Sequence, residues 1–145
     1  MDRFRRFAAL TCIALAACQA GEDITGGLGG LAIDATAAVV PPPAQNVKVT
    51  ATVTNISTNP LTINYSGCVV MPVFHSGSLD GPIVYDSRTG VECALILITK
   101  TLDPNQSVQI TGGAVPNLPA GKYFVGAVIT INGSAVTLGA GTVTF

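Results

Sequence analysis

Four cysteines and a single histidine are the side chains of this 145-residue sequence best suited to nucleophilic, redox or metal chemistry. The histidine is His75, and the cysteines are Cys12, Cys18, Cys68 and Cys93. A structural zinc site needs about four Cys or His ligands, usually with CxxC spacing. The sequence contains no CxxC pair. We therefore predict no metal ion and no cofactor, and each cysteine needs another role.

His75 lies in the stretch FHSGSLDG, residues 74–81, close to two serines and to Asp80. These are the residue types of a Ser-His-Asp hydrolase. That mechanism requires the base to lie between a nucleophile and an orienting acid, next to an oxyanion hole. Residues so close together in a glycine-rich turn rarely converge in this way, and the G-x-S-x-G nucleophile motif is absent. The pattern favours a solvated loop, and we predict that the protein is not an enzyme.

A second group of functional residue types follows in YDSRTGVEC, residues 85–93, where three charged side chains cluster. They form either a solvated loop with a weak surface ion pair or a recognition patch. Long connections on rigid scaffolds often carry function. We therefore take residues 75–92 as the candidate binding loop, with a purely structural connection between strands as the alternative. Its candidate contact residues are His75, Asp80, Tyr85, Asp86, Arg88 and Glu92.

The N-terminus has the layout of a secretory signal peptide. Three arginines within residues 1–6 precede an uncharged, mainly apolar run over residues 7–17. A basic start, a short apolar stretch and a small-residue end are typical of such signals. The run is shorter than the roughly 20 apolar residues that a membrane-spanning helix needs. The sequence therefore predicts export rather than a membrane span.

The end of this run, Leu15-Ala16-Ala17-Cys18, resembles the lipobox of bacterial lipoproteins. The resemblance implies that residues 1–17 are a lipoprotein signal peptide and that Cys18 becomes the lipidated first residue of the mature protein. Several acyl chains give a stable membrane anchor, whereas a single chain is marginal. Gln19, in place of Asp, favours the outer membrane of the cell envelope. The alternative is an ordinary secretory signal that is cut near Ala20.

Removal of residues 1–17 leaves Cys68 and Cys93 as the two cysteines without an assigned role. Because disulfides persist in an oxidising compartment, we predict a Cys68–Cys93 disulfide. The remaining chain has four basic and seven acidic side chains, a net charge of −3. The absence of a basic stripe excludes nucleic acid as a partner. No small-molecule ligand is implied.

The sequence after the signal peptide and tether predicts strands and turns. Residues 18–30 are glycine-rich and predict a flexible tether after the lipidated cysteine, and residues 31–145 predict one domain. Residues 47–55 alternate apolar and polar side chains, as in a half-buried strand. Residues 93–102 begin with a continuous apolar run, which is typical of a strand buried on both faces. The other expected strands are 31–37, 61–65, 68–74, 82–86, 106–112, 121–132 and 135–145, which together predict an all-β sandwich.

Three stretches resemble motifs of bacterial immunoglobulin-like domains: VTNISTNPLTI (53–63), LDPNQSVQI (102–110) and LPAGKYFVGAVI (118–129). The resemblance implies an immunoglobulin-like β-sandwich of about seven to nine strands. It also implies a tyrosine-corner hydrogen bond from Tyr123. The order of these stretches is similar to the BsuPI family, the intracellular proteinase inhibitor type. That similarity implies protease inhibition as one function.

These observations predict a non-enzymatic, envelope-anchored lipoprotein that presents an immunoglobulin-like domain for protein–protein contact or envelope structure. The lipid on Cys18 would make the membrane one partner, and an unknown protein, such as a protease, would be the other. One alternative is a proteinase inhibitor of the BsuPI type. A further alternative is a self-assembling surface subunit, because the chain has few charges and Thr-rich strands whose edges could pair.

Overall fold

The structure is a computed structural model that describes residues 28–40, 46–94 and 96–145. Within these ranges the chain forms nine β-strands and no helix, which confirms the all-β prediction. One sheet has the order β1-β2-β7, with the bounds Leu31–Val40, Asn46–Asn55 and Ser107–Ala114. The predicted signal peptide, Cys18 and most of the tether lie outside the described residues.

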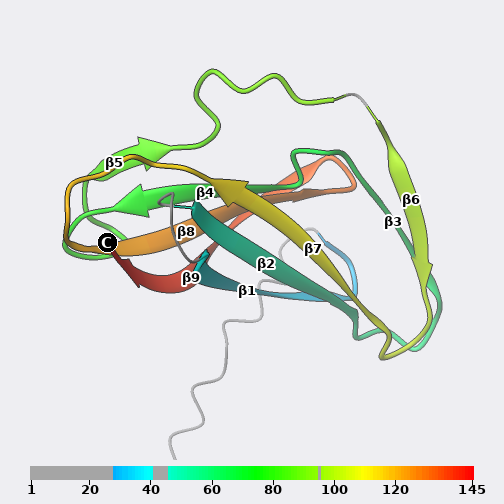
Figure 1. Cartoon of the computed structure of the whole chain (residues 1–145). Helices are drawn as coiled ribbons and strands as arrows, with labels where there is room; N and C mark the ends of the chain where they lie inside the picture. The colour runs from blue at the N-terminus through cyan, green and yellow to red at the C-terminus, as the bar shows by residue number, and fades with distance from the viewer. Residues whose placement is uncertain (1–27, 41–45, 95) are drawn as a thin grey trace, which may run out of the picture.

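The second sheet has the order β5-β4-β8-β9. Its strands are Ile83–Asp86, Val70–His75, Lys122–Ile131 and Ser134–Thr144. In immunoglobulin-like sandwiches, strands A, B and E share one sheet, and strands C, F and G share the other. Here β1, β2 and β7 occupy positions A, B and E, and β4, β8 and β9 occupy positions C, F and G. The strand order is therefore immunoglobulin-like, with β5 added outside β4 (Figure 1).

The core lies between the two sheets and follows the predicted alternation. Val47, Val49, Ala51 and Val53 of β2 have no solvent exposure. The intervening residues of β2, which are Lys48 and three threonines, are exposed or half-buried. On the opposite sheet, β8 contributes Val125, Ala127, Ile129 and Ile131, all fully buried. Both strands therefore place one apolar face in the core, as period-two alternation requires.

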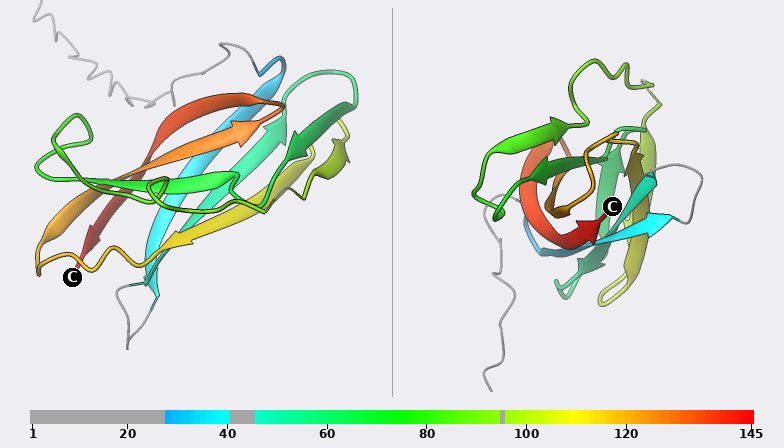
Figure 2. Two further views of the ribbon diagram at one scale, coloured as in Figure 1. Left: turned by 90° about the horizontal axis from the view of Figure 1, so that it is seen from above. Right: turned by 60° about the vertical axis from the view of Figure 1, so that its left-hand side comes forward.

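The remaining strands, β3 (Leu61–Tyr65) and β6 (Ile98–Leu102), form a two-stranded antiparallel sheet at one end of the sandwich (Figure 1). The paired strands β2 and β7 lead into this sheet through two turns, which form a corner. Residues 56–60 connect β2 to β3, and residues 103–106 connect β6 to β7. Two views from other directions show the β3–β6 pair set apart from the larger sheets (Figure 2). β6 pairs only with β3 among the described strands, so its outer edge is free.

Asn55 holds this corner together. Its side chain is fully buried. The Asn55 Nδ2 group donates to the main-chain oxygens of Asn59 (2.8 Å) and Leu102 (2.9 Å). Its Oδ1 accepts from the main-chain N–H (2.9 Å) and the hydroxyl (2.7 Å) of Ser57. One amide thus joins the β2–β3 turn to the end of β6.

Two turns show the residue preferences of their conformations. Asn132 and Gly133 both have positive φ angles, 51° and 76°, in the two-residue turn between β8 and β9. This is the conformation of a type I′ hairpin turn, which favours Asn-Gly. The Tyr123 hydroxyl donates to the Pro119 oxygen at 2.9 Å, the hydrogen bond expected of a tyrosine corner. The pairing of β8 and β9 shifts register between Gly139 and Gly141, which lie opposite Gly126 and Val125.

The backbones of the two sheets come close together where β4 meets β7. A Cβ atom placed on Gly112 of β7 would overlap the main-chain oxygen of Val70 in β4. Gly112 pairs with the buried Val49 and therefore faces the core. Glycine at this position allows the two backbones to come together.

Candidate functional site

The connection between β5 and β6, residues 87–97, of which the structure describes 87–94 and 96–97, is the longest connection between described strands. We call it the β5–β6 segment. It arches over the sandwich from β5 to the β3–β6 sheet (Figure 1). A disulfide joins Cys93, near its middle, to Cys68, just before β4, with a Cα–Cα distance of 5.5 Å. The predicted disulfide is therefore present, and it ties the segment to the body of the fold.

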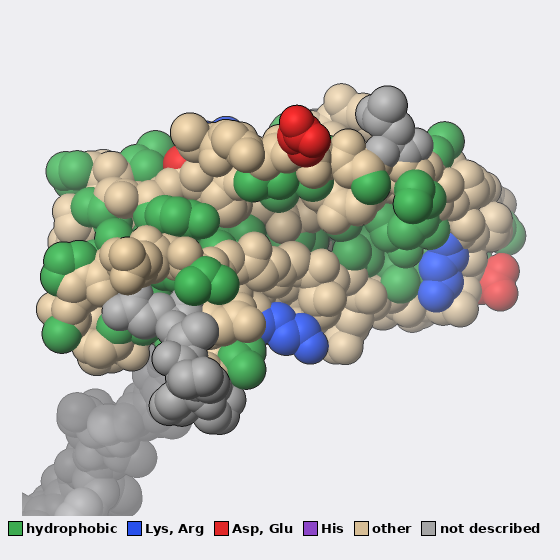
Figure 3. All heavy atoms as spheres, turned by 45° about the horizontal axis from the view of Figure 1, so that its top comes forward, with side chains coloured by type: hydrophobic (Ala, Val, Ile, Leu, Met, Phe, Trp, Pro, Cys, Tyr) green, Lys and Arg blue, Asp and Glu red, His purple; other side chains and the backbone are tan. Residues whose placement is uncertain are grey.

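The β5–β6 segment and the start of β6 expose apolar side chains. The exposed fractions are 48% for Val91, 66% for Ile96, 69% for Leu97 and 41% for Ile98. We call these four residues the apolar patch. Figure 3 shows hydrophobic side chains spread over this face, with one group at its right end next to a basic side chain. Ile96, Leu97 and Ile98 are consecutive in the chain, and clustered apolar exposure marks interaction surfaces more often than scattered single residues do.

The apolar patch overturns one prediction. Residues 93–102 were expected to form a strand buried on both faces, but the strand begins only at Ile98, and Leu102 is its one buried residue. The physical reason is the position of β6 in a two-stranded sheet with a free edge. Burial on both faces requires a layer on each side, and the sandwich provides none there. The apolar run therefore faces solvent.

The predicted binding loop, residues 75–92, is divided by β5 and is not one loop. His75 ends β4, and its ring Nδ1–H donates to the Gly81 oxygen at 2.9 Å. This hydrogen bond closes the β4–β5 turn, which carries the exposed Asp80. Because Nδ1 is occupied by a main-chain oxygen, no acid orients the imidazole from that side, as a catalytic triad requires. His75 has a structural role in the turn.

The other charged residues of the predicted loop lie at the end of β5 or after it. Arg88 Nη2 lies 2.6 Å from Asp86 Oδ2, and the Arg88 main-chain N–H also donates to Asp86. Hydrogen bonding from the Arg88 side chain lowers the pKa of the Asp86 carboxyl, and the pKa of Arg88 is raised by the same contact. Tyr85 packs edge-to-face against Phe74, with ring centroids 5.6 Å apart. Glu92 is exposed on the segment. The structure thus joins Asp86 to Arg88, and a smaller electrostatic effect of His75 also lowers the pKa of the Asp86 carboxyl.

A pocket of about 400 Å³ lies beneath the β5–β6 segment. We call it the Ser87 pocket. Its walls come from the starts of β2 and β4, the ends of β5 and β7, and the segment itself. The lining includes Cys68, Met71, Tyr85, Ser87, Val91 and Val115. No local sequence pattern predicts this pocket, because its walls come from four separate stretches of the chain.

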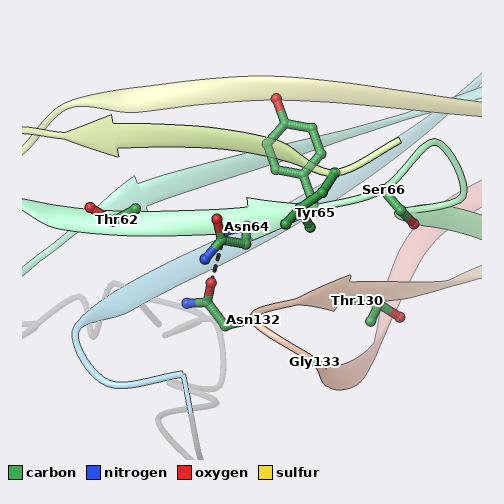
Figure 4. A pocket seen from close by; sticks show the side chains of 8 residues that line it. Thr62, Asn64, Tyr65, Ser66, Thr130, Asn132 and Gly133 are labelled. Carbon is green, nitrogen blue, oxygen red and sulfur yellow. Dashed lines mark hydrogen bonds between the residues drawn. The ribbon is translucent and has the colours of Figure 1, made fainter. Parts of the chain in front are cut away.

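A second, open pocket of about 500 Å³ lies where β3 meets the β8–β9 hairpin. Asn132 Oδ1 accepts from the main-chain N–H of Asn64 at 2.8 Å, and the Asn132 N–H donates to the Asn64 oxygen at 2.9 Å. Figure 4 shows the Asn132 side chain pointing toward Asn64, while the Tyr65 ring projects to the other side of β3. The Asn64 side chain also accepts from Thr99 at 2.7 Å. These bonds dock the hairpin onto the β3–β6 sheet, so this pocket has a structural explanation.

The part of the chain that the structure describes contains no group of three or more side chains able to hold a metal ion. In the same part, no helix is long and apolar enough to cross a membrane.

Neither a known protein family nor a curated protein matches the sequence. The chain is similar to a solved structural-genomics target designated SoR45, at 13% identity, over 79% of this chain and 84% of that one, with a TM-score of 0.42. It is also similar to a Bordetella pertussis protein designated ApaA, at 16% identity, over 78% of this chain and 89% of that one, with a TM-score of 0.42. Neither likeness extends to a function or to a site residue.

Proposed function

We propose that this protein is a non-enzymatic lipoprotein of the bacterial cell envelope whose immunoglobulin-like sandwich binds another protein through the β5–β6 segment. The observation that carries the proposal is the apolar patch, Val91 and Ile96 to Ile98, which is exposed on a segment tied down by a disulfide. Burying such side chains against a partner contributes roughly 25 cal/mol per Å² of apolar surface removed from water.

The disulfide makes this segment a better binding surface than a free loop of the same composition. Association costs roughly 0.5–1.5 kcal/mol for each flexible side chain that it immobilises, and more when backbone must be ordered. The bond at Cys93 restrains the segment before any partner arrives. Among the described residues of the patch and its immediate neighbours, Glu92 and Lys100 are the only charged side chains. The surface therefore suits a largely neutral partner.

Lipidation of Cys18 would place this surface at the membrane, with residues 18–30 as a tether. The proposal predicts that Cys18→Ala moves the protein from the membrane fraction to the soluble fraction of cells. Cys12→Ala is the matched control, because that residue leaves with the predicted signal peptide. Unchanged partitioning of Cys18→Ala would contradict lipid anchoring without affecting the proposed contact surface.

The contact surface is tested by a crosslinking pull-down from whole cells, comparing the wild type with Leu97→Ser. We expect the variant to lose a partner band that the wild type captures, because Leu97 is the most exposed residue of the patch. Val39→Ser is the matched control, since Val39 is also exposed, at 41%, but lies on β1. Equal capture by all three proteins would contradict binding through the segment.

Protease inhibition is a second candidate function. The observation that favours it is an irregular segment that is exposed from Arg88 to Ala94 and carries a disulfide near its middle, a form that can be offered to a protease active site. A protease panel assayed with the full chain tests this function. Inhibition that disappears when residues 88–92 are replaced by Gly and Ser would support it. A lack of inhibition across all protease classes would exclude it.

Self-assembly through the free edge of β6 is disfavoured by Lys100. Lys100 pairs with the fully buried Ile63 and so shares its face of the sheet. Charged residues on the inner face of an edge strand prevent pairing of one edge with another. We therefore expect a monomer by light scattering at high protein concentration, and a concentration-dependent oligomer would restore the assembly hypothesis.

A further inference from the structure

β6 has an edge to which another strand can be added. Among the described strands it pairs only with β3, and Figure 1 shows it outermost at its end of the molecule. In an antiparallel sheet, about half of the main-chain N–H and C=O groups of such a strand point away from its single neighbour. Four of the five residues of β6 are exposed. The outer edge of β6 is therefore accessible to a segment of another chain.

The register of β3 and β6 determines which side chains an added strand would meet. Ile98, Lys100 and Leu102 lie on the inner face of this sheet, because their partners in β3 belong to the core or pack against it. Thr99 and Thr101 lie on the outer face, where each hydrogen-bonds a side chain of β3. A strand added to β6 would continue both rows, so it would meet an apolar residue, Thr, Lys, Thr and an apolar residue in turn.

Lys100 determines which strands fit this edge. It is the only charged residue of β6 and is exposed. It makes no ion pair within the described part of the chain, where the one salt bridge joins Arg88 to Asp86. A second copy of β6 aligned centre to centre would set two like charges directly opposite each other, which is destabilising. A carboxylate opposite Lys100 would instead form a favourable cross-strand pair. The edge is thus closed to that copy and suited to a strand with an acidic residue at this position.

The apolar patch continues this edge along the chain. Ile98 belongs to both the patch and β6, and Ile96 and Leu97 precede it directly. A segment that runs along β6 and past Ile98 would therefore reach the rest of the patch. One extended ligand can contact both the lysine and the exposed apolar side chains.

We propose that an extended segment of the partner protein adds to β6 as a further strand and places an acidic residue opposite Lys100. Apolar residues two positions before and after the acid face Ile98 and Leu102, and the residues between them face Thr99 and Thr101. Main-chain hydrogen bonds to the edge supply affinity, and the side-chain pairs set the register. The segment is otherwise neutral, like the surroundings of the patch. This inference rests on the proposed protein-binding function and names the binding mode and the chemistry of the partner.

The test uses the peptide acetyl-Val-Thr-Glu-Thr-Val-amide, whose symmetric sequence gives the same side-chain pairs in either strand direction. It is titrated into the ¹⁵N-labelled full chain with the disulfide intact, and amide shifts are followed by NMR. A probe of this size has an expected Kd on the order of 1 mM. We expect the shifts to centre on β6. The glutamine analogue should bind about 2- to 5-fold more weakly, and the lysine analogue more weakly still. The glutamate peptide with N-methylated amides should not bind, because it cannot pair with the edge.

Charge reversal at position 100 tests the pairing itself. In Lys100→Glu the order of affinities should invert, so that the lysine peptide binds more tightly than the glutamate peptide. Lys48→Glu is the matched control, because Lys48 is also exposed but lies on β2, and this variant should keep the wild-type order. Lys100→Gln should bind the two charged peptides equally, with the shifts still centred on β6, which would show that the fold is intact.

The outcomes separate this inference from the proposed function. Shifts away from β6, no shifts at about ten times the expected Kd, or wild-type binding that ignores the charge of the peptide would overturn strand addition. Full binding of the N-methylated peptide, or an unchanged order of affinities in Lys100→Glu, would also overturn it. Loss of partner capture from cells in Leu97→Ser with full capture in Lys100→Glu would keep the proposed function and reject strand addition. The inverted peptide preference without any captured protein would keep the β6 edge as a binding site and reject the proposed function.

Discussion

The amide of Asn55 gives the sharpest stability prediction. Asn55→Ala removes four hydrogen bonds at the corner where β2 turns into β3. Most of the lost stability comes from the main-chain oxygen of Leu102, because its hydrogen bond to Asn55 is buried. The oxygen of Asn59 and the donors of Ser57 lie nearer the surface, where water can replace the amide in part.

The magnitude follows from these bonds. A buried acceptor left without a partner costs about 1–3 kcal/mol, and each remaining bond contributes about 0.5–1.5 kcal/mol net of water. Partial replacement by water lowers the sum, so we expect Asn55→Ala to cost about 3–4 kcal/mol. Domains of this size have total stabilities of about 5–15 kcal/mol, so the variant should fold but melt much earlier.

The assay is urea unfolding of the full chain, with the disulfide intact in every sample. Asn59→Ala is the matched control, because Asn59 contributes only main-chain atoms to these hydrogen bonds, and it should cost less than about 0.5 kcal/mol. A cost below about 1 kcal/mol for Asn55→Ala would refute the role assigned to the amide.

Asn55→Asp adds a pH signature to the same test. It keeps the acceptor for Ser57 but sets a carboxylate against two main-chain oxygens, so burial should raise the pKa of the new carboxyl. A group with a raised folded-state pKa contributes stability below its unfolded pKa and loses it as the pH rises. The free energy of unfolding that Asn55→Asp loses relative to wild type should therefore be smallest below about pH 4, the ordinary pKa of aspartate. It should increase as the pH rises toward neutrality. A deficit that does not change with pH would contradict the buried contacts.

Three further predictions concern the sheets and the segment. Gly112→Ala should destabilise the fold by at least about 1–3 kcal/mol, the usual cost of overpacking, whereas Gly113→Ala, whose Cβ would find its nearest atom at 3.4 Å, should change the urea midpoint little. Reducing the disulfide should cost up to about 3.5 kcal/mol in the chain-entropy model and should make residues 87–97 the first site of limited proteolysis; cleavage starting elsewhere would contradict this. The Asp86 carboxyl should titrate below its ordinary pKa by NMR and return to it in Arg88→Ala; the small stability that the ion pair contributes is present above the unfolded pKa and is lost as the pH falls through the folded one.

Most strands could be predicted because their signals are local. The alternation in residues 47–55 depends only on successive side chains facing opposite sides of a strand, and β2 spans Asn46–Asn55. The Asn132-Gly133 turn follows from the cost of positive φ angles for other residues. Residues 61–65 form β3 with the predicted bounds. In each case neighbours in the sequence determine the conformation.

Burial of the 93–102 stretch could not be predicted in the same way. An apolar run shows that side chains gain from burial, but only the tertiary arrangement decides whether a second layer is present. β6 lies in a two-stranded sheet at the end of the sandwich, so Ile96 and Leu97 face solvent. The Ser87 pocket could not be predicted from the sequence either, because its walls come from stretches far apart in the chain. The predicted loop, residues 75–92, therefore located part of the candidate site and missed its most exposed residues.

The central claim, protein contact through the β5–β6 segment, is tested most directly by photo-crosslinking in whole cells. A photoreactive amino acid is placed at position 97 in one strain and at position 39 in another. Leu97 and Val39 are both exposed, at 69% and 41%, but only Leu97 belongs to the apolar patch. We predict a single crosslinked protein of defined mass from position 97 and none from position 39. No adduct at position 97, or the same adducts from both positions, would contradict the claim.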